Sequence, residues 1–205
     1  MPRAPHSQEQ RDIIRRRILD AAQELFDSSG IDAVSMRALG ARVGLTASAL
    51  YAYFPAKIDL LRTLWWDALD DLHARMIRLS DGEPDPVAAI RGIGQAYVAF
   101  GLENPARFRV LFMADQGALA EELKSAGVYH DAYRLFRHRV AEAIDQRRLG
   151  LDDPDLCAQT IWAGVHGVVN LVSSSASFPF VAPTVLATTT IDALLAGLAL
   201  RPAEE

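Results

Sequence analysis

The sequence has little of what secreted, membrane-spanning or disulfide-stabilised proteins need. Cys157 is the single cysteine in 205 residues, which excludes an internal disulfide and a four-cysteine zinc site. The N-terminal segment is polar and has no apolar core of a secretory signal. The most apolar run, residues 161–172, contains His166 and Asn170 and is shorter than the ~20 residues of a membrane helix. We therefore expect a cytoplasmic protein with no membrane partner.

Signals of catalysis and of cofactor binding are also sparse. The sequence contains no GxSxG, no phosphate-binding P-loop and no GxGxxG. Its five histidines include no pair at i, i+4 spacing that would bind a metal from one helix face. Cys157 has no candidate base near it in the sequence. We expect no enzyme activity, no cofactor and no metal.

The charge is divided unevenly between the two ends of the chain, although the net charge is only −5. Residues 1–63 contain nine lysines and arginines against seven acidic residues, whereas the rest contains twelve against nineteen. Such an asymmetry indicates different partners for the two ends, and the basic end is the one suited to nucleic acid.

The remaining pattern predicts an all-α chain, because no strand-like alternation persists and turn residues recur at helix-length intervals. We expect an N-terminal three-helix domain over residues 1–60. A fourth helix shared by both domains joins it to a C-terminal helical bundle over residues 61–205. The expected helices lie at about 10–29, 36–43, 47–54, 56–79, 86–103, 105–122, 127–149, 154–173 and 184–199.

Two of the short helices are predicted to form a helix-turn-helix. Ser35 and Thr46 can cap their N-termini, and Gly44 between them can adopt the positive φ of a tight turn. At 100° per residue, Leu50 and Phe54 share one apolar face of the second short helix. The opposite face carries small residues, with tyrosines on its two flanks: Ser48, Ala49, Ala52, Tyr51 and Tyr53. Such a face can approach the DNA major groove closely, while flanking hydroxyls contact phosphates.

The run Ser35 to Lys57, SMRALGARVGLTASALYAYFPAK, resembles the DNA-binding signature of the tetracycline-repressor (TetR) family. The resemblance covers about residues 13–65 and departs from the family at Gly40, Ser48 and Tyr53, where Ala, Gly and His are more usual. It implies a double-stranded DNA operator as partner. Carried over by position, the expected DNA-binding residues are Ser35, Arg37, Thr46, Ala47, Ser48, Tyr51, Tyr53 and Lys57.

The helix-turn-helix and the arginines of the first helix also have a purely structural interpretation. A helix-turn-helix can be an inert packing unit, and a single tyrosine in it is often part of the core. Arg15, Arg16 and Arg17 are interpreted as a solvated helix face, with contacts to the DNA backbone as the alternative.

The C-terminal half resembles the family's effector-binding and dimerisation domain, and WAGVHG at residues 162–167 resembles the Trp-His-Gly signature of one subtype. The last two helices are apolar on nearly every side, which predicts an isologous four-helix interface with a second copy. The expected interface residues are Ala158, Ile161, Val165, Val169, Ile191 and Leu195. Residues that could contact a small-molecule effector, or form plain core, are Tyr97, Phe100, Phe108, Phe112, Tyr133, Trp162 and His166.

The sequence thus predicts a dimeric DNA-binding transcriptional regulator, a repressor that leaves a near-palindromic operator when a small molecule binds. Two alternatives stay open: a DNA binder or activator without an effector, and a helical ligand-binding protein without DNA function. The sequence does not identify the effector, the operator or the regulated genes.

Overall fold

The structure is a computed structural model that describes residues 7–30, 33–112, 130–175 and 177–200. Within these residues all regular structure is helical, apart from one isolated bridge between Leu149 and Ala199. The helices are α1 (Gln8–Ser29), α2 (Met36–Val43), α3 (Ala47–Tyr51), α4 (Lys57–Ser80), α5 (Pro86–Glu103), α6 (Pro105–Phe112), α8 (His130–Asp145), α9 (Pro154–Ser174) and α10 (Pro183–Leu198). The all-α expectation is confirmed for the described residues.

The chain forms two compact units. Unit 1 contains the described residues up to Ala68 together with residues 106–112 of α6. Unit 2 contains residues 69–105 and the described residues from 130 onward. The division between the units therefore falls inside α4, after Ala68, whereas the expected domain boundary follows residue 60. Unit 1 also includes residues 106–112, which come after the first part of unit 2 in the sequence. Parts of the expected helices at 105–122 and 127–149 lie outside the described residues.

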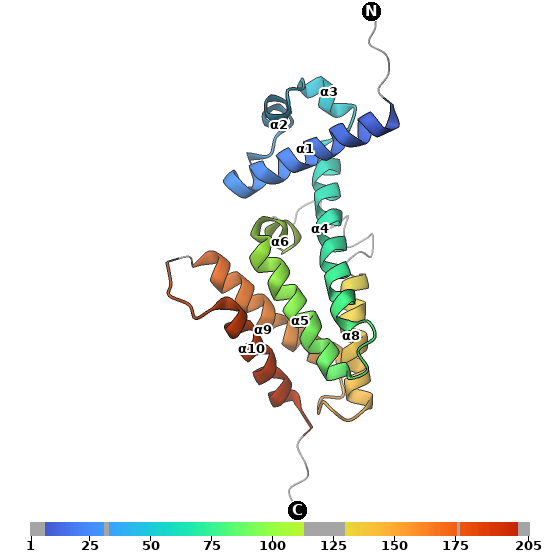
Figure 1. Cartoon of the computed structure of the whole chain (residues 1–205), viewed down its shortest axis with the longest axis vertical. Coiled ribbons are helices and arrows are strands. Elements are labelled where there is room, and N and C mark those ends of the chain that lie inside the picture. Colours follow the sequence, from blue (N-terminus) through green and yellow to red (C-terminus); the bar gives the residue numbers. More distant parts are fainter. Residues whose placement is uncertain (1–6, 31–32, 113–129, 176, 201–205) are drawn as a thin grey trace, which may run out of the picture. The chain divides into compact units, whose positions relative to one another are not determined.

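Unit 1 is built on α1, with α2 and α3 beside it (Figure 1). Its core consists of apolar side chains from α1 to α4 and the segments between them, each no more than 1% exposed: Ile18, Ala22, Val34, Leu39, Leu50, Phe54, Leu60 and Trp65. Burying each large apolar side chain contributes roughly 1.5–3 kcal/mol. Because α2 and α3 are too short to be stable alone, this shared core holds them in place.

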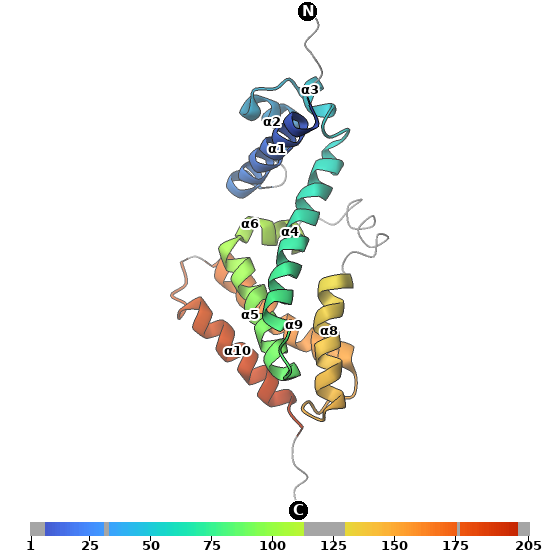
Figure 2. The same cartoon turned by 45° about the vertical axis from the view of Figure 1, so that its right-hand side comes forward.

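Unit 2 packs α9 against α10, α5 and α8 (Figure 2). Helices α5 and α9 each begin with an aspartate N-cap followed by a proline. The Asp85 side chain accepts a hydrogen bond from the Val87 N–H, and the Asp153 side chain accepts one from the Leu156 N–H. Helix α9 has 21 residues and a mean hydropathy of 1.2 over its most apolar window, so by length and composition it could cross a membrane. Its fully buried residues, such as Ile161 and Val169, pack within unit 2 as in the core helix of a globular bundle.

Candidate nucleic-acid interface

The turn between α2 and α3 has the expected capping. The Ser35 side chain accepts a hydrogen bond from the Ala38 N–H at 3.2 Å, and Thr46 Oγ1 accepts from the Ala49 N–H at 3.1 Å. Gly44 has φ 71° and ψ 29°, the left-handed conformation that ends α2, and its N–H donates to the Gly40 carbonyl. These bonds fix the start of α3 within a few residues of the end of α2, as a helix-turn-helix requires.

Helix α3 has one buried face and one open face. Leu50 is fully buried and Phe54, just beyond the helix, is 1% exposed. Thr46, Ala47 and Ser48 at its N-terminal end are exposed, and Tyr51 is 49% exposed. A protruding short helix with small polar and methyl side chains at its N-terminal end can enter the major groove with little steric hindrance.

Tyr53 does not lie on α3, because the helix ends at Tyr51 and Ala52 is its C-cap. The Ala52 N–H is shared between two carbonyls, of Ala49 and Leu50, and the chain then turns toward α4. The Tyr53 side chain is half-buried, and the Arg11 guanidinium lies 5.8 Å from its ring centroid. The sequence-based picture of two tyrosines on opposite flanks of one helix is therefore wrong, since only Tyr51 projects from α3.

The other expected DNA contacts lie at the starts of α2 and α4. Ser35 and Arg37 are exposed at the start of α2. Lys57 is the first residue of α4 and is half-buried. Helix α2 also carries Arg42, but that guanidinium lies 2.7 Å from the Glu24 carboxylate and is already paired. Arg37 is therefore the α2 cation best placed to act at the exposed N-terminal end of that helix.

The three consecutive arginines of α1 all make contacts within the chain. Arg16 pairs with Asp67 at 3.2 Å, and Arg17 donates to the Val43 carbonyl at 3.5 Å. Arg15 is half-buried against the end of α3. A solvated face is thus the wrong description for Arg15, although Arg16 and Arg17 remain largely exposed.

Four of the seven expected effector residues come together in unit 2. The Tyr97 hydroxyl on α5 lies 2.6 Å from Nδ1 of His166 on α9, and the rings of Trp162 and His166 have centroids 6.2 Å apart. Tyr133 on α8 lies 6.3 Å from Trp162 by ring centroids. These four side chains, which we call the aromatic cluster, run from α5 across α9 to α8.

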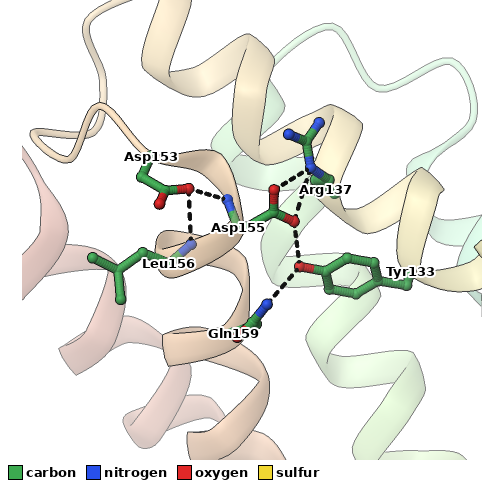
Figure 3. Close-up of polar contacts among 6 residues, drawn as sticks. All are labelled: Tyr133, Arg137, Asp153, Asp155, Leu156 and Gln159. Carbon is green, nitrogen blue, oxygen red and sulfur yellow. Dashed lines mark hydrogen bonds and ion pairs between the residues drawn. The ribbon is translucent and has the colours of Figure 1, made fainter.

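Tyr133, at the α8 end of this cluster, also takes part in a group of polar contacts (Figure 3). The Tyr133 hydroxyl donates to Asp155 Oδ1 at 2.8 Å, and Arg137 Nε lies 2.9 Å from both oxygens of that carboxylate. Hydrogen bonds from Tyr133 and Arg137 lower the pKa of Asp155. Burial raises the pKa of Tyr133 and of Tyr97, and it lowers the pKa of His166. At neutral pH the cluster therefore presents neutral aromatic groups beside a compensated ion pair.

The other three expected effector residues lie elsewhere. Phe100 is fully buried with the Arg75 guanidinium 5.6 Å from its ring centroid. Phe108 and Phe112 contact each other on α6, with ring centroids 4.8 Å apart. Phe108 is 1% exposed and belongs to unit 1 rather than to the aromatic cluster.

The six expected interface side chains are enclosed by their own chain. Each is at most 5% exposed: Ala158, Ile161, Val165, Val169, Ile191 and Leu195. A side chain without exposed surface in one copy has none to bury against a second copy. Residues of α9 and α10 that a partner could reach are those on the opposite, exposed faces of these helices, for example Ala163 and Ala193.

Comparisons with known proteins agree with this geometry. Residues 18–64 match the family described as bacterial regulatory proteins, tetR family, and residues 90–195 match the tetracyclin repressor-like C-terminal domain. The Trp-His-Gly subtype is not confirmed by these matches and stays a prediction. A nucleoid occlusion factor SlmA from Photobacterium profundum is 24% identical over 163 residues, covering 76% of this chain and 82% of the relative.

Solved structures share the fold. The TetR family transcriptional regulator PfmR from Thermus thermophilus has a TM-score of 0.74 at 23% identity, with 90% of this chain and 100% of that chain covered. RolR, solved with its ligand resorcinol, has a TM-score of 0.60 at 18% identity, with 94% of this chain and 90% of that chain covered. Because the C-terminal match alone spans more than half of the chain and the N-terminal match covers the helix-turn-helix, the protein belongs to the TetR family of DNA-binding transcriptional regulators.

Proposed function

We propose that this TetR-family chain is a repressor, which binds a near-palindromic operator as a homodimer and leaves it when a small molecule binds unit 2. The proposal of DNA binding rests on α3, which has one buried face and one exposed face. Leu50 and Phe54 anchor the helix from within, while the end that holds Ala47 and Ser48 is free of large side chains and exposed. The proposed contacts are Ser35, Arg37, Thr46, Ala47, Ser48, Tyr51, Tyr53 and Lys57.

The proposed base readout is weak and the proposed phosphate contacts are numerous. Ala47 offers only a methyl group and Ser48 only a hydroxyl, so neither selects a particular base strongly. Arg37, Tyr51 and Lys57 carry groups that hydrogen-bond to phosphate oxygens. On this basis, operator choice depends on Arg37 and on the spacing of two half-sites about 34–36 Å apart.

The proposed dimer uses the exposed faces of α9 and α10. Leu156 and Leu171 on α9 are each 55% exposed, and Val185 on α10 is 57% exposed. Gly167 and Gly197 have open space where a Cβ would stand, so a second helix could approach them closely. Two such helices from each copy would form an isologous four-helix interface. This moves the proposed contact from the buried residues to the opposite faces.

The proposed effector site is the aromatic cluster of Tyr97, Tyr133, Trp162 and His166. Its hydrogen-bonding groups are neutral or paired with each other, which favours an uncharged aromatic molecule with one or two hydroxyl groups. RolR, which shares the fold, was solved with resorcinol, a molecule of that kind. Similarity of fold alone does not transfer a ligand, so this assignment rests on the cluster's own chemistry.

The proposed route from effector to DNA is a shift between two conformations, of which the ligand favours the one with wrongly spaced α3 helices. Helix α4 belongs to both units and is the proposed coupling element. Helix α6 adds a second connection, because it follows α5 of unit 2 directly and packs within unit 1. Arg107 on α6 donates to the Asp67 carbonyl of α4 at 2.7 Å, and the Arg109 guanidinium lies 5.9 Å from the Phe26 ring of α1.

The experiment that tests the DNA contact compares operator affinity for wild type, Ser48→Glu and Gln146→Glu. Both substituted positions are exposed, so neither change should disturb folding. A carboxylate at Ser48 would face phosphates and should reduce affinity at least tenfold, whereas one at Gln146, beyond α8 in unit 2, should leave it unchanged. Equal affinities for all three proteins would remove α3 from the interface.

An activator or an effector-independent DNA binder is the competing function. Transcription in vitro from a promoter that carries the selected operator distinguishes the two. A repressor lowers the transcript yield in the absence of ligand, and phenolic compounds then restore it. A yield that rises on adding the protein, or that no phenolic compound changes, would favour the competing function.

A further inference from the structure

Arg15 of α1 contacts the chain at three points around the end of the DNA-reading helix. One terminal nitrogen of its guanidinium, Nη1, donates to the Tyr53 carbonyl at 3.2 Å, and the other, Nη2, donates to Thr63 Oγ1 at 3.1 Å. Its carbon Cζ lies 4.4 Å from the centroid of the Phe54 ring. A planar guanidinium presents two terminal donor nitrogens in a fixed fork, a geometry that the single nitrogen of an ammonium does not reproduce.

These three contacts join three helices of unit 1. Tyr53 and Phe54 lie in the segment that leaves α3, whereas Thr63 lies in the second turn of α4. Thr63 Oγ1 itself donates to the Asp59 carbonyl at 2.9 Å, and the Asp59 carboxylate accepts from the Ala56 N–H at 2.9 Å. The Arg15 side chain thus connects α1 to a hydrogen-bonded start of α4 and to the end of α3.

Helix α3 needs such support because it has only five residues. The last carbonyls of a helix have no partner inside it, and a helix this short has almost no stability of its own. Arg11 donates to the Ala52 carbonyl at 3.4 Å and Arg15 to the Tyr53 carbonyl, so α1 supplies donors to the first two carbonyls after α3. The Arg15 contact is the shorter of the two, and its side chain is less exposed than that of Arg11.

We propose that Arg15 is a positioning residue for DNA binding, which holds α3 at its reading angle through Tyr53, Phe54 and Thr63 and does not contact DNA itself. The proposal rests on DNA binding through α3. It differs from the ordinary role of a basic residue in such a domain, which is to neutralise a phosphate. Both terminal nitrogens of Arg15 donate hydrogen bonds within unit 1, and its Cζ lies over the Phe54 ring.

The test uses Arg15→Lys, which keeps the positive charge and removes the fork. Arg16→Lys is the matched control, because Arg16 is the next residue of α1, makes a largely exposed ion pair with Asp67, and such pairs contribute little to stability. The first readout is hydrogen exchange of the backbone amides of residues 47–54 in the full-length protein without DNA. The second is operator affinity measured between about 50 and 200 mM salt.

For Arg15→Lys we expect faster exchange of the α3 amides and about a tenfold loss of operator affinity at every salt concentration. The slope of log K against log salt should stay that of wild type, because no phosphate contact is lost. The Arg16→Lys protein should match wild type in both readouts, and the urea midpoint of Arg15→Lys should show that its domain is still folded.

Two results would overturn the proposal. One is an Arg15→Lys protein with wild-type exchange and wild-type affinity. The other is retained affinity in Arg15→Lys together with a shallower salt slope in Arg15→Gln, which would make Arg15 a phosphate contact. A wild-type protein that selects no operator would instead count against the repressor proposal, and the exchange measurement would still decide whether Arg15 holds α3.

Discussion

The Tyr97 hydroxyl on α5 and Nδ1 of His166 on α9 lie 2.6 Å apart, 69 residues distant in sequence. Burial raises the pKa of the phenol and lowers the pKa of the imidazole, so both side chains are neutral over the physiological range. The tautomer of the neutral imidazole sets the direction of this hydrogen bond, because either Nδ1 or the phenol oxygen can be the donor. This pair connects α5 and α9 of unit 2 at one end of the aromatic cluster.

The first prediction concerns pH. Because the folded chain holds the pKa of His166 below its ordinary value of 6.5, the unfolded chain takes up the proton first as the pH falls. The stability contributed by neutral His166 is complete above pH 6.5 and decreases as the pH falls below it. Urea unfolding at several pH values between about 8 and 5 should therefore show a smaller loss of stability in His166→Gln than in wild type. Identical pH dependence in the two proteins would contradict the burial of this group.

The second prediction concerns the turn of the helix-turn-helix. Gly44 has φ 71°, and a residue with a Cβ pays roughly 1–2 kcal/mol to adopt that conformation. Gly44→Ala should lower the free energy of unfolding by about that amount in urea denaturation. The space around Gly44 is open, so steric contact would add nothing to the cost. An unchanged free energy of unfolding would mean that the turn adopts another conformation.

The third prediction concerns Tyr51, which is 49% exposed on the outer side of α3. Tyr51→Phe removes one hydroxyl and should weaken operator binding about tenfold, because a hydrogen bond to a charged acceptor contributes at least about 1.5 kcal/mol. Gln146→Ala is the control, because Gln146 is exposed beyond the end of α8 in unit 2. Fluorescence anisotropy with labelled operator measures both. Equal losses in the two variants would argue against a direct DNA contact by Tyr51.

The fourth prediction concerns formation of the homodimer. Ala193 on α10 is exposed in one chain, and Ala193→Arg would place a large charged side chain in the proposed four-helix interface. Sedimentation velocity should show a shift from dimer to monomer, with a parallel loss of operator binding. Gln146→Arg adds the same side chain beyond the end of α8 and should leave the dimer intact. A dimer that survives Ala193→Arg would exclude this face.

Helix positions could be predicted from the sequence where local chemistry decides them. Proline at position 86 and asparagine-proline at 104–105 mark helix ends by their effect on the backbone, and α5 spans the expected 86–103. Helix α2 begins after its expected N-cap Ser35 and ends at Gly44, and α3 begins after its expected N-cap Thr46. The expected end of α3 at residue 54 is too late, because Ala52 and the residues after it turn toward α4. That turn is a consequence of tertiary packing, which propensity does not reveal.

The sequence did not reveal which sides of α9 and α10 face the core of their own chain. Helices α9 and α10 are apolar on several sides, so periodicity does not distinguish the side that faces α5 from the side that faces a partner. The large β-branched residues such as Ile161 and Ile191 fill the chain's own core, whereas the exposed sides carry alanine, glycine and threonine as well as leucine. The contacts of Arg15 could not be predicted from the sequence either, because Tyr53 and Thr63 lie 38 and 48 residues away along the chain.

The most direct test of the account is selection of binding sites from random double-stranded DNA by the full-length protein. Two copies related by two-fold symmetry, each presenting one α3, should enrich a near-palindrome with half-site centres about 10–10.5 base pairs, or a multiple of that, apart. Enrichment of one unpaired half-site would contradict the dimer. Enrichment of no sequence at all would contradict the central claim that this protein is an operator-binding repressor.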